Sequence, residues 1–237
     1  MKRVLLGVLG VVCVLGLSAT AFFFYYTVNQ PKAVFWETSI ASFEEEDAAT
    51  PPSEGTVIFI GSSSIRFWKT LARDFAPLPV LNRGFGGSHL SHVTHFAPRV
   101  VIPHKPAAVV VYAGDNDFGG WEPKSSEEVF SDFKKMMSLF GKELQGTPVY
   151  YLSIKPSRLR WESWPKIEKA NALIRALAEK DDQLTYIDVS SRMIGEDGEP
   201  RSDLFWYDGL HLSERGYEEW TAIVRPILMN DLGTLSE

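Results

Sequence analysis

The chain has 237 residues, a formal net charge of −6 at pH 7 and an apolar share of 45%. Acidic residues outnumber basic ones by 30 to 24 and no basic patch stands out, so we expect no nucleic-acid partner. The single cysteine excludes an intramolecular disulfide, and stability must therefore come from an ordinary hydrophobic core.

Residues 1–27 predict an N-terminal membrane anchor or signal segment. Lys2 and Arg3 precede a largely apolar run over residues 4–26, long enough to cross a bilayer core of about 30 Å as one helix. Basic residues before such a helix stay in the cytoplasm, which puts the rest of the chain on the extracytoplasmic side. The competing interpretation is a signal peptide cleaved near the Ala-Thr-Ala of residues 19–21, which would leave a secreted or periplasmic protein. The length of the run favours the retained single-pass anchor.

Residues 28–54 have the composition of a linker. They are rich in proline, serine, alanine and acidic residues, including the acidic run over residues 44–47, and can bury little apolar surface. A short helix around residues 35–43 is the one element that we expect there. The remaining residues 55–237 have the size of one domain.

Five short apolar runs within this domain predict strands. Three of them are continuous and end near glycine or proline, which is typical of parallel strands covered on both faces. The expected strands cover residues 56–60, 79–82, 109–112, 149–154 and 184–188.

Helices are predicted between and after these strands, because apolar residues recur there at steps of three and four. They cover about residues 129–144, 167–178 and 213–228, and the last is expected to bend or end near Pro226. Alternation of strands and helices predicts an α/β fold. We expect a three-layer α/β/α sandwich around a five-stranded, mostly parallel sheet.

Polar segments follow these strands, at the edge of the sheet where ligands bind in such folds. Serines 62–64 follow the first strand, a glycine-rich segment over residues 82–88 follows the second, and Asn116 follows the third. Asp208 and His211 share a loop before the last helix. A serine hydroxyl needs a nearby base, and the base works best when a carboxylate fixes its tautomer. Backbone N–H groups and the Asn116 amide can donate to an acyl oxyanion.

In their order and spacing, these four segments resemble the four blocks of the SGNH (GDSL-type) hydrolases. The resemblance is closest to the lysophospholipase-like and platelet-activating-factor-acetylhydrolase-like branches, and it implies the flavodoxin-like SGNH hydrolase fold for residues 55–237. It also implies Ser63 as nucleophile, Asp208 and His211 as its partners, and Gly87 and Asn116 in the oxyanion hole.

One position departs from the family pattern. Ser62 stands where the family usually has aspartate, which leaves Ser62 and Ser64 as alternative nucleophiles. Alignment on Gly61 selects Ser63.

The resemblance implies a serine esterase that hydrolyses carboxylic (acyl or acetyl) esters through an acyl-enzyme, without a metal or organic cofactor. The expected substrate is a small ester or an acylated lipid or glycan. Two alternatives are an acyltransferase or deacetylase of cell-envelope glycans, which would use the same residues, and a catalytically dead binding module.

Two further groups of residues lie near the expected site. Arg158 and Trp161 follow the fourth strand and either bind substrate or cap the next helix. His89, His92 and His95 have the residue type of a metal site. At helical spacing the first and last lie about 120° apart around the axis, so we expect no metal there.

Overall fold

The computed structural model describes residues 32–120 and 122–233. By its contacts the chain divides into two units, the first ending at Glu37 and the second beginning at Thr38. The described part of the first unit contains the short 3-10 helix η1 (Ala33–Trp36). In these described ranges, no helix is both long enough and apolar enough to span a bilayer. The anchor predicted over residues 1–27 lies outside them.

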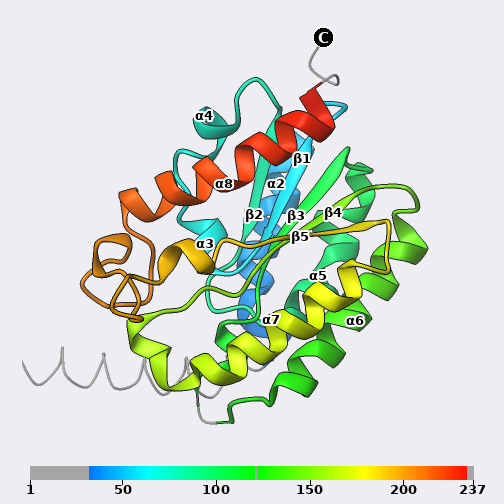
Figure 1. The fold of residues 1–237 in the computed structure, drawn as a ribbon. Helices are drawn as coiled ribbons and strands as arrows, with labels where there is room; N and C mark the ends of the chain where they lie inside the picture. The colour runs from blue at the N-terminus through cyan, green and yellow to red at the C-terminus, as the bar shows by residue number, and fades with distance from the viewer. Residues whose placement is uncertain (1–31, 121, 234–237) are drawn as a thin grey trace, which may run out of the picture. The chain divides into compact units, whose positions relative to one another are not determined.

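The second unit is built on a five-stranded sheet in which every neighbouring pair is parallel (Figure 1). The strand order is β2-β1-β3-β4-β5, so the direction of connection reverses between β1 and β3, where open α/β sheets bind ligands. The predicted fold and all five strands are confirmed. The strands are β1 (Val57–Gly61), β2 (Val80–Gly84), β3 (Ala108–Tyr112), β4 (Val149–Leu152) and β5 (Leu184–Ile187).

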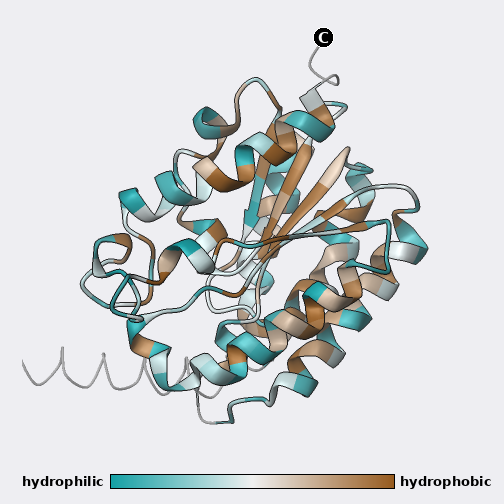
Figure 2. Cartoon of the chain, in the orientation of Figure 1, coloured by the Kyte–Doolittle hydropathy of each residue, from teal (hydrophilic) through white to brown (hydrophobic). Residues whose placement is uncertain are grey.

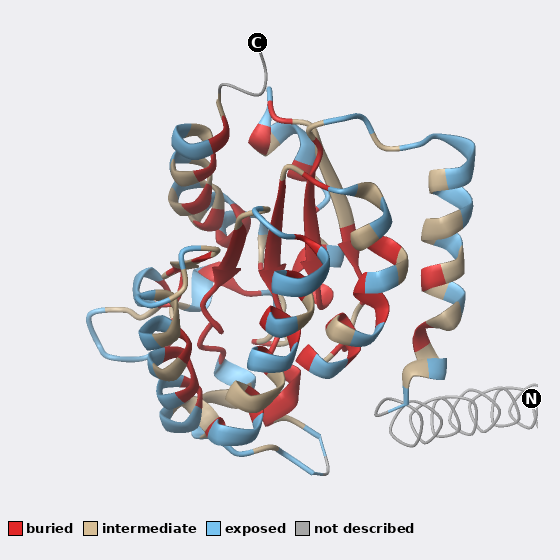
Figure 3. Ribbon diagram, turned by 90° about the vertical axis from the view of Figure 1, so that its right-hand side faces the viewer, coloured by how far each residue is buried: buried red, intermediate tan, exposed pale blue. Residues whose placement is uncertain are grey.

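Helices cover both faces of the sheet (Figure 1). Figure 2 shows apolar strands with helices that are polar on their outer sides, and Figure 3 shows the central strands as buried. One face is covered by α3 (Ser63–Arg66), α4 (Leu71–Phe75) and α8 (Glu214–Leu232), and the other by α5 (Leu90–Val100), α6 (Ser126–Glu143) and α7 (Trp164–Ala178).

Aromatic side chains fill the core on the α8 face. The Trp68 ring lies 5.9 Å from those of both Phe59 and Trp220, and the Trp220 ring lies 4.8 Å from that of Tyr112. All four side chains are at most 1% exposed. This packing fixes α8 to β1 and β3, the two strands that lead into the expected site.

Helix α8 continues through Pro226 to Leu232, so it does not end near that proline, and the alternative of a bend there stays a prediction. Proline costs one backbone hydrogen bond in a helix interior. Burial of Val224, Leu228 and Leu232 on the core face offsets this cost.

Helix α2 (Glu37–Ala49) lies within the expected linker, longer than the short helix predicted there. The burial of Ile40 and several ion pairs hold it: Arg99 Nε and Nη2 donate to the Glu44 carboxylate at 2.8 and 2.7 Å, and Arg83 pairs with Asp47. Arg83 is only 2% exposed, so this ion pair is part of the interior. The boundary at residue 54 stays a prediction.

Candidate active site

The turn after β1 presents Ser63 at the edge of the sheet. A side chain at Gly61 would put its Cβ 1.8 Å from the Tyr112 carbonyl oxygen, and its φ of +148° also favours glycine. This close approach lets the Ser62 N–H donate to the same oxygen at 3.0 Å, and α3 begins at the next residue. Ser62 and Ser64 are at most 1% exposed, with buried Oγ atoms, whereas Ser63 is 8% exposed. Ser63 is therefore the most accessible of the three serines.

Asp208 and His211 form a hydrogen-bonded pair in the loop before α8, which lies at the same end of the sheet as α3 (Figure 1). The Asp208 Oδ2 to His211 Nδ1 distance is 2.7 Å, and Asp208 Oδ1 accepts the backbone N–H groups of Leu210 and His211. Burial alone would raise the Asp208 pKa, but these hydrogen bonds outweigh it and hold the pKa below its usual value. The carboxylate thus stays charged and holds the imidazole through Nδ1. Nε2 is then the ring nitrogen that can accept a proton.

Aromatic contacts connect this loop to the helix of Ser63. The His211 ring lies 5.2 Å from that of Phe67 and 5.6 Å from that of Trp206. The Phe67 N–H in turn donates to the Ser63 carbonyl at 2.8 Å. The Tyr217 hydroxyl of α8 donates to the carbonyl of Ser64 in the same helix at 3.0 Å. The expected nucleophile and base therefore belong to one packed unit.

The glycine-rich turn after β2 lies against Ser63. A Cβ at Gly86 would lie 3.7 Å from that of Ser63, so the backbone passes close to the serine. Gly87 follows in the left-handed region, with φ of +78°, and is buried. Gly87, which the sequence singled out for the oxyanion hole, thus directly follows the residue that passes beside Ser63, and its role stays a prediction.

Asn116 begins the 3-10 helix η3 (Asn116–Phe118) and is 7% exposed. Its Nδ2 donates to the Ser88 carbonyl at 3.0 Å, and its Oδ1 accepts from Arg160 Nη2 at 2.8 Å. The turns after β2 and β3 are thus joined through this amide.

A buried charge cluster lies next to Asn116. Asp115 Oδ2 is 2.8 Å from Lys155 Nζ and 3.2 Å from Arg160 Nη1. Burial by itself would raise the Asp115 pKa, but the charges of Lys155, Arg160 and, more weakly, His211 lower it to about 2. For Lys155, burial outweighs the attraction of Asp115 and lowers the pKa. One carboxylate is therefore shared by two cations.

Of the three histidines singled out by the sequence, His89 is the N-cap of α5, and His92 and His95 lie within this helix. His92 Nδ1 accepts the His89 N–H at 3.0 Å, which caps the helix. His89 Nδ1 is 3.6 Å from Asp117 Oδ1, a fully buried carboxylate that pairs with Lys124. Burial, aided by the Lys124 charge, lowers the His89 pKa to about 4. These contacts assign His89 and His92 a part in holding α5 to η3.

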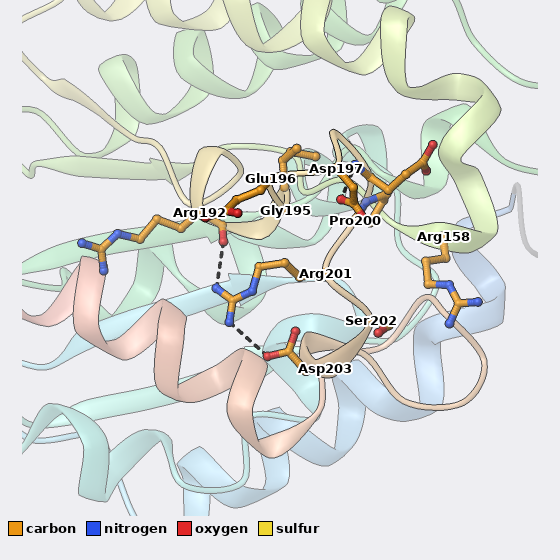
Figure 4. A pocket seen from close by; sticks show the side chains of 11 residues that line it. Arg158, Arg192, Gly195, Glu196, Asp197, Pro200, Arg201, Ser202 and Asp203 are labelled. Atoms are coloured by element: carbon orange, nitrogen blue, oxygen red, sulfur yellow. Dashed lines mark hydrogen bonds and ion pairs between the residues drawn. The ribbon is translucent and has the colours of Figure 1, made fainter.

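Arg158 and Trp161 lie in η4 (Arg158–Ser163), beside the Asp208–His211 loop. The Leu159 N–H donates to the Gly209 carbonyl at 3.1 Å. Arg158 lines one side of a polar hollow of about 940 Å³, with Arg192 and Arg201 on the other side (Figure 4). The Trp161 ring stacks on that of Trp164 at 5.7 Å, as a cap on α7 would. Substrate binding by Arg158 and Trp161 stays a prediction.

A second hollow, of about 460 Å³, begins at the aromatic rings beside His211. It is lined by Phe67, Trp206, Leu212 and Tyr217, together with polar residues of α4 and α8. Trp206 is 42% exposed and Tyr207 is fully exposed. An apolar surface therefore reaches solvent directly beside the histidine.

The sequence did not identify the roles of Asp115, Lys155 and Arg160. Asp115 stands at the variable position of the third block, and Lys155 and Arg160 belong to none of the four blocks. The signal that could have found Asp115 and Lys155 is a charged residue three positions after the end of an apolar strand, which occurs at both. Such a residue enters the interior and needs a partner.

Comparison with known proteins bears on the family of the chain. The sequence model of the GDSL-like Lipase/Acylhydrolase family matches residues 60–219. Platelet-activating factor acetylhydrolase IB subunit alpha1 of Pongo abelii is 29% identical over 182 residues, which cover 72% of this chain and 74% of that protein.

Solved structures show the same fold. A GDSL-like lipase from Bacteroides thetaiotaomicron has a TM-score of 0.70 at 23% identity, covering 81% of this chain and 98% of that one. A family 3 carbohydrate esterase from Clostridium thermocellum has a TM-score of 0.60 at 15% identity, covering 78% and 100%. Because the family match spans more than half of the chain, the protein belongs to the GDSL-like lipase/acylhydrolase family of SGNH-type enzymes, which hydrolyse ester bonds.

Proposed function

We propose that the protein is a serine esterase that cleaves carboxylic esters through an acyl-enzyme on Ser63. The observation that carries the proposal is the position of His211. Its ring is hydrogen-bonded to Asp208 and also contacts Phe67, the residue that ends the helix of Ser63. A base oriented by a carboxylate and packed against the helix of an accessible serine is the arrangement that activates a hydroxyl.

In the proposed reaction, Ser63 Oγ attacks the ester carbonyl carbon as His211 takes the hydroxyl proton. Asp208 holds the imidazole and stabilises its positive charge. The tetrahedral oxyanion accepts hydrogen bonds from Asn116 Nδ2 and from the backbone N–H groups of Gly87 and Ser63. Collapse expels the alcohol, which takes the proton from His211. Water then attacks the acyl-enzyme with His211 as base, which releases the acid and frees Ser63.

The substrate that we propose is an ester of a short acyl group. The acetylhydrolase name of the curated relatives supports a small acyl part. The apolar hollow beside Phe67 and Trp206 offers room for an apolar part of the substrate next to the proton donor. The polar hollow at Arg158 suits a charged or hydroxylated part instead.

The experiment that tests this proposal is the burst of p-nitrophenolate from p-nitrophenyl acetate. Ser63→Ala is expected to abolish both the burst and turnover while the protein stays folded. Ser62→Ala and Ser64→Ala are matched controls, because their buried Oγ atoms have no hydrogen-bond partner in the described structure and their loss should be tolerated. Near-normal turnover by Ser63→Ala would refute the assignment of the nucleophile.

The location of the domain is part of the same proposal. Residues 1–27 carry two basic residues followed by an apolar run of spanning length, which supports a single-pass anchor with the enzyme on the extracytoplasmic side. The protein should then stay in the membrane fraction after alkaline washing and be cleaved by protease added from the outer side. Recovery of the full-length protein in the soluble fraction would contradict the anchor.

A further inference from the structure

Arg160 connects the proposed oxyanion donor to the buried charge cluster. Its Nη2 donates to Asn116 Oδ1 at 2.8 Å, and its Nη1 lies 3.2 Å from Asp115 Oδ2. The Arg160 side chain is 15% exposed. It lies directly against the backbone of Gly119, where a Cβ would come within 2.8 Å of Arg160 Nε. The guanidinium therefore occupies a fitted position rather than a surface one.

These contacts determine which way the Asn116 amide points. A guanidinium can only donate hydrogen bonds, so the end of the amide that faces Arg160 must be Oδ1. The Ser88 carbonyl can only accept, so the end that faces it must be Nδ2. A rotated amide would lose both hydrogen bonds. The Nδ2 group has two hydrogens, and the one not used by Ser88 keeps a fixed direction.

The charge of Arg160 acts on the same amide. A cation that donates to the carbonyl oxygen of an amide draws electron density toward that oxygen. The N–H groups at the other end become stronger donors, as in other polarised hydrogen-bond chains. The charge is permanent because arginine does not lose its proton in proteins. Asp115 balances only one of the two cations that it contacts, Lys155 and Arg160.

We propose that Arg160 is a positioning residue of the esterase, which orients and polarises the Asn116 amide for the acyl oxyanion. This inference rests on the proposed function, in which Asn116 is an oxyanion donor. Arg160 itself does not touch the substrate, so its contribution passes entirely through Asn116. Its removal should therefore weaken the transition state and leave binding of the ground-state ester nearly unchanged.

A double-mutant cycle on the full-length protein tests this inference, with p-nitrophenyl acetate as substrate. Arg160→Met is expected to lower kcat by about 10- to 100-fold with KM within about 2-fold, the range of a hydrogen bond to a charged group. Asn116→Ala should lower kcat by about 100- to 1000-fold. In the Asn116→Ala background, Arg160→Met should then change kcat by less than about 2-fold, because the amide on which it acts is gone.

Two further variants sharpen the test. Arg160→Gln can still donate to Asn116 Oδ1 but has no charge, so it should regain part of the kcat lost in Arg160→Met. It also carries the test if Arg160→Met does not fold. Arg175→Met is the matched control, because Arg175 on α7 pairs with Asp188 at 3.0 Å away from Asn116. It should keep the kcat of the unaltered protein.

Three results would overturn the inference. An equal loss of kcat from Arg160→Met in the unaltered protein and in Asn116→Ala would mean that Arg160 acts independently of Asn116. A raised KM with normal kcat would make Arg160 a substrate ligand. A normal kcat in Asn116→Ala would remove the oxyanion role of Asn116, and the role of Arg160 with it. Only this last result bears on the proposed function itself.

Discussion

Asp115→Asn should destabilise the protein more than Lys155→Met, although the two residues form one ion pair. Both side chains are nearly fully buried, at 5% and 1% exposed, and removal of one partner of a buried pair costs about 3 to 5 kcal/mol. Lys155→Met leaves Asp115 with Arg160 at 3.2 Å, so its cost should lie near 3 kcal/mol. Asp115→Asn leaves two cations without their shared anion, so its cost should lie near 5 kcal/mol.

The pH dependence provides a second signature of this asymmetry. Without Asp115, the buried Lys155 should lose its proton more readily, and its pKa in the folded state falls further below that in the unfolded state. Between the two pKa values the unfolded state binds more protons, so the stability of Asp115→Asn should rise with pH. The slope is at most about 1.4 kcal/mol per pH unit, and the gain should be visible as the pH rises toward the ordinary lysine pKa of about 10.4. Lys155→Met should show no such gain.

Urea unfolding followed by tryptophan fluorescence and circular dichroism measures both effects. A shifted urea midpoint, with an unchanged dependence of the unfolding free energy on urea concentration, would show that the variants differ in stability. If Lys155→Met is the less stable variant, or if the deficit of Asp115→Asn does not change with pH, Arg160 does not share the Asp115 carboxylate in the way described.

Three other predictions concern stability. The His89 pKa of about 4 lies below the ordinary value of about 6.5, so the unfolded state binds more protons between these two pH values. Up to about 3 kcal/mol of the free energy of unfolding should therefore be lost as the pH falls through this range. His89→Gln should not show this loss when urea unfolding is measured at several pH values. A variant starting at Gly55 should be soluble and active but melt below one starting at Thr38, because Arg83 loses its α2 partner. Gly61→Ala should express mostly as insoluble protein, since its Cβ would overlap the facing carbonyl of β3.

The strands and the order of the site segments could be predicted because short stretches of sequence determine both. A continuous apolar run such as residues 109–111 has few alternatives to a buried parallel strand. Helices α6 and α7 are long enough for their apolar residues to show the helical period. Helices α3 and α4 have only four and five residues, too few for a periodic pattern. Helix α5 was not predicted as an element, because three histidines and Pro98 interrupt its apolar pattern.

The charge cluster could not be predicted because it depends on which loops meet. Arg160 lies 44 residues after Asn116, and their hydrogen bond forms only when η4 folds back over η3. Nothing in the local sequence of η4 distinguishes Arg160 from Arg158, yet one is largely buried beside Asn116 and the other is exposed. The packing of α2 could not be predicted for the same reason. An acidic run by itself indicates solvent exposure, and only the fold places the buried Arg83 opposite it.

The hydrogen bond from the Tyr217 hydroxyl to the Ser64 carbonyl has a consequence for biosynthesis, because it spans 153 residues. The helix that bears Ser63 emerges early from the ribosome, but Tyr217, which donates to this helix, belongs to the last helix. Contacts of such sequence separation form late. A chain arrested before α8 should therefore contain most of the sheet but have no burst activity, and activity should appear abruptly in a series of arrested chains once Tyr217 has left the exit tunnel.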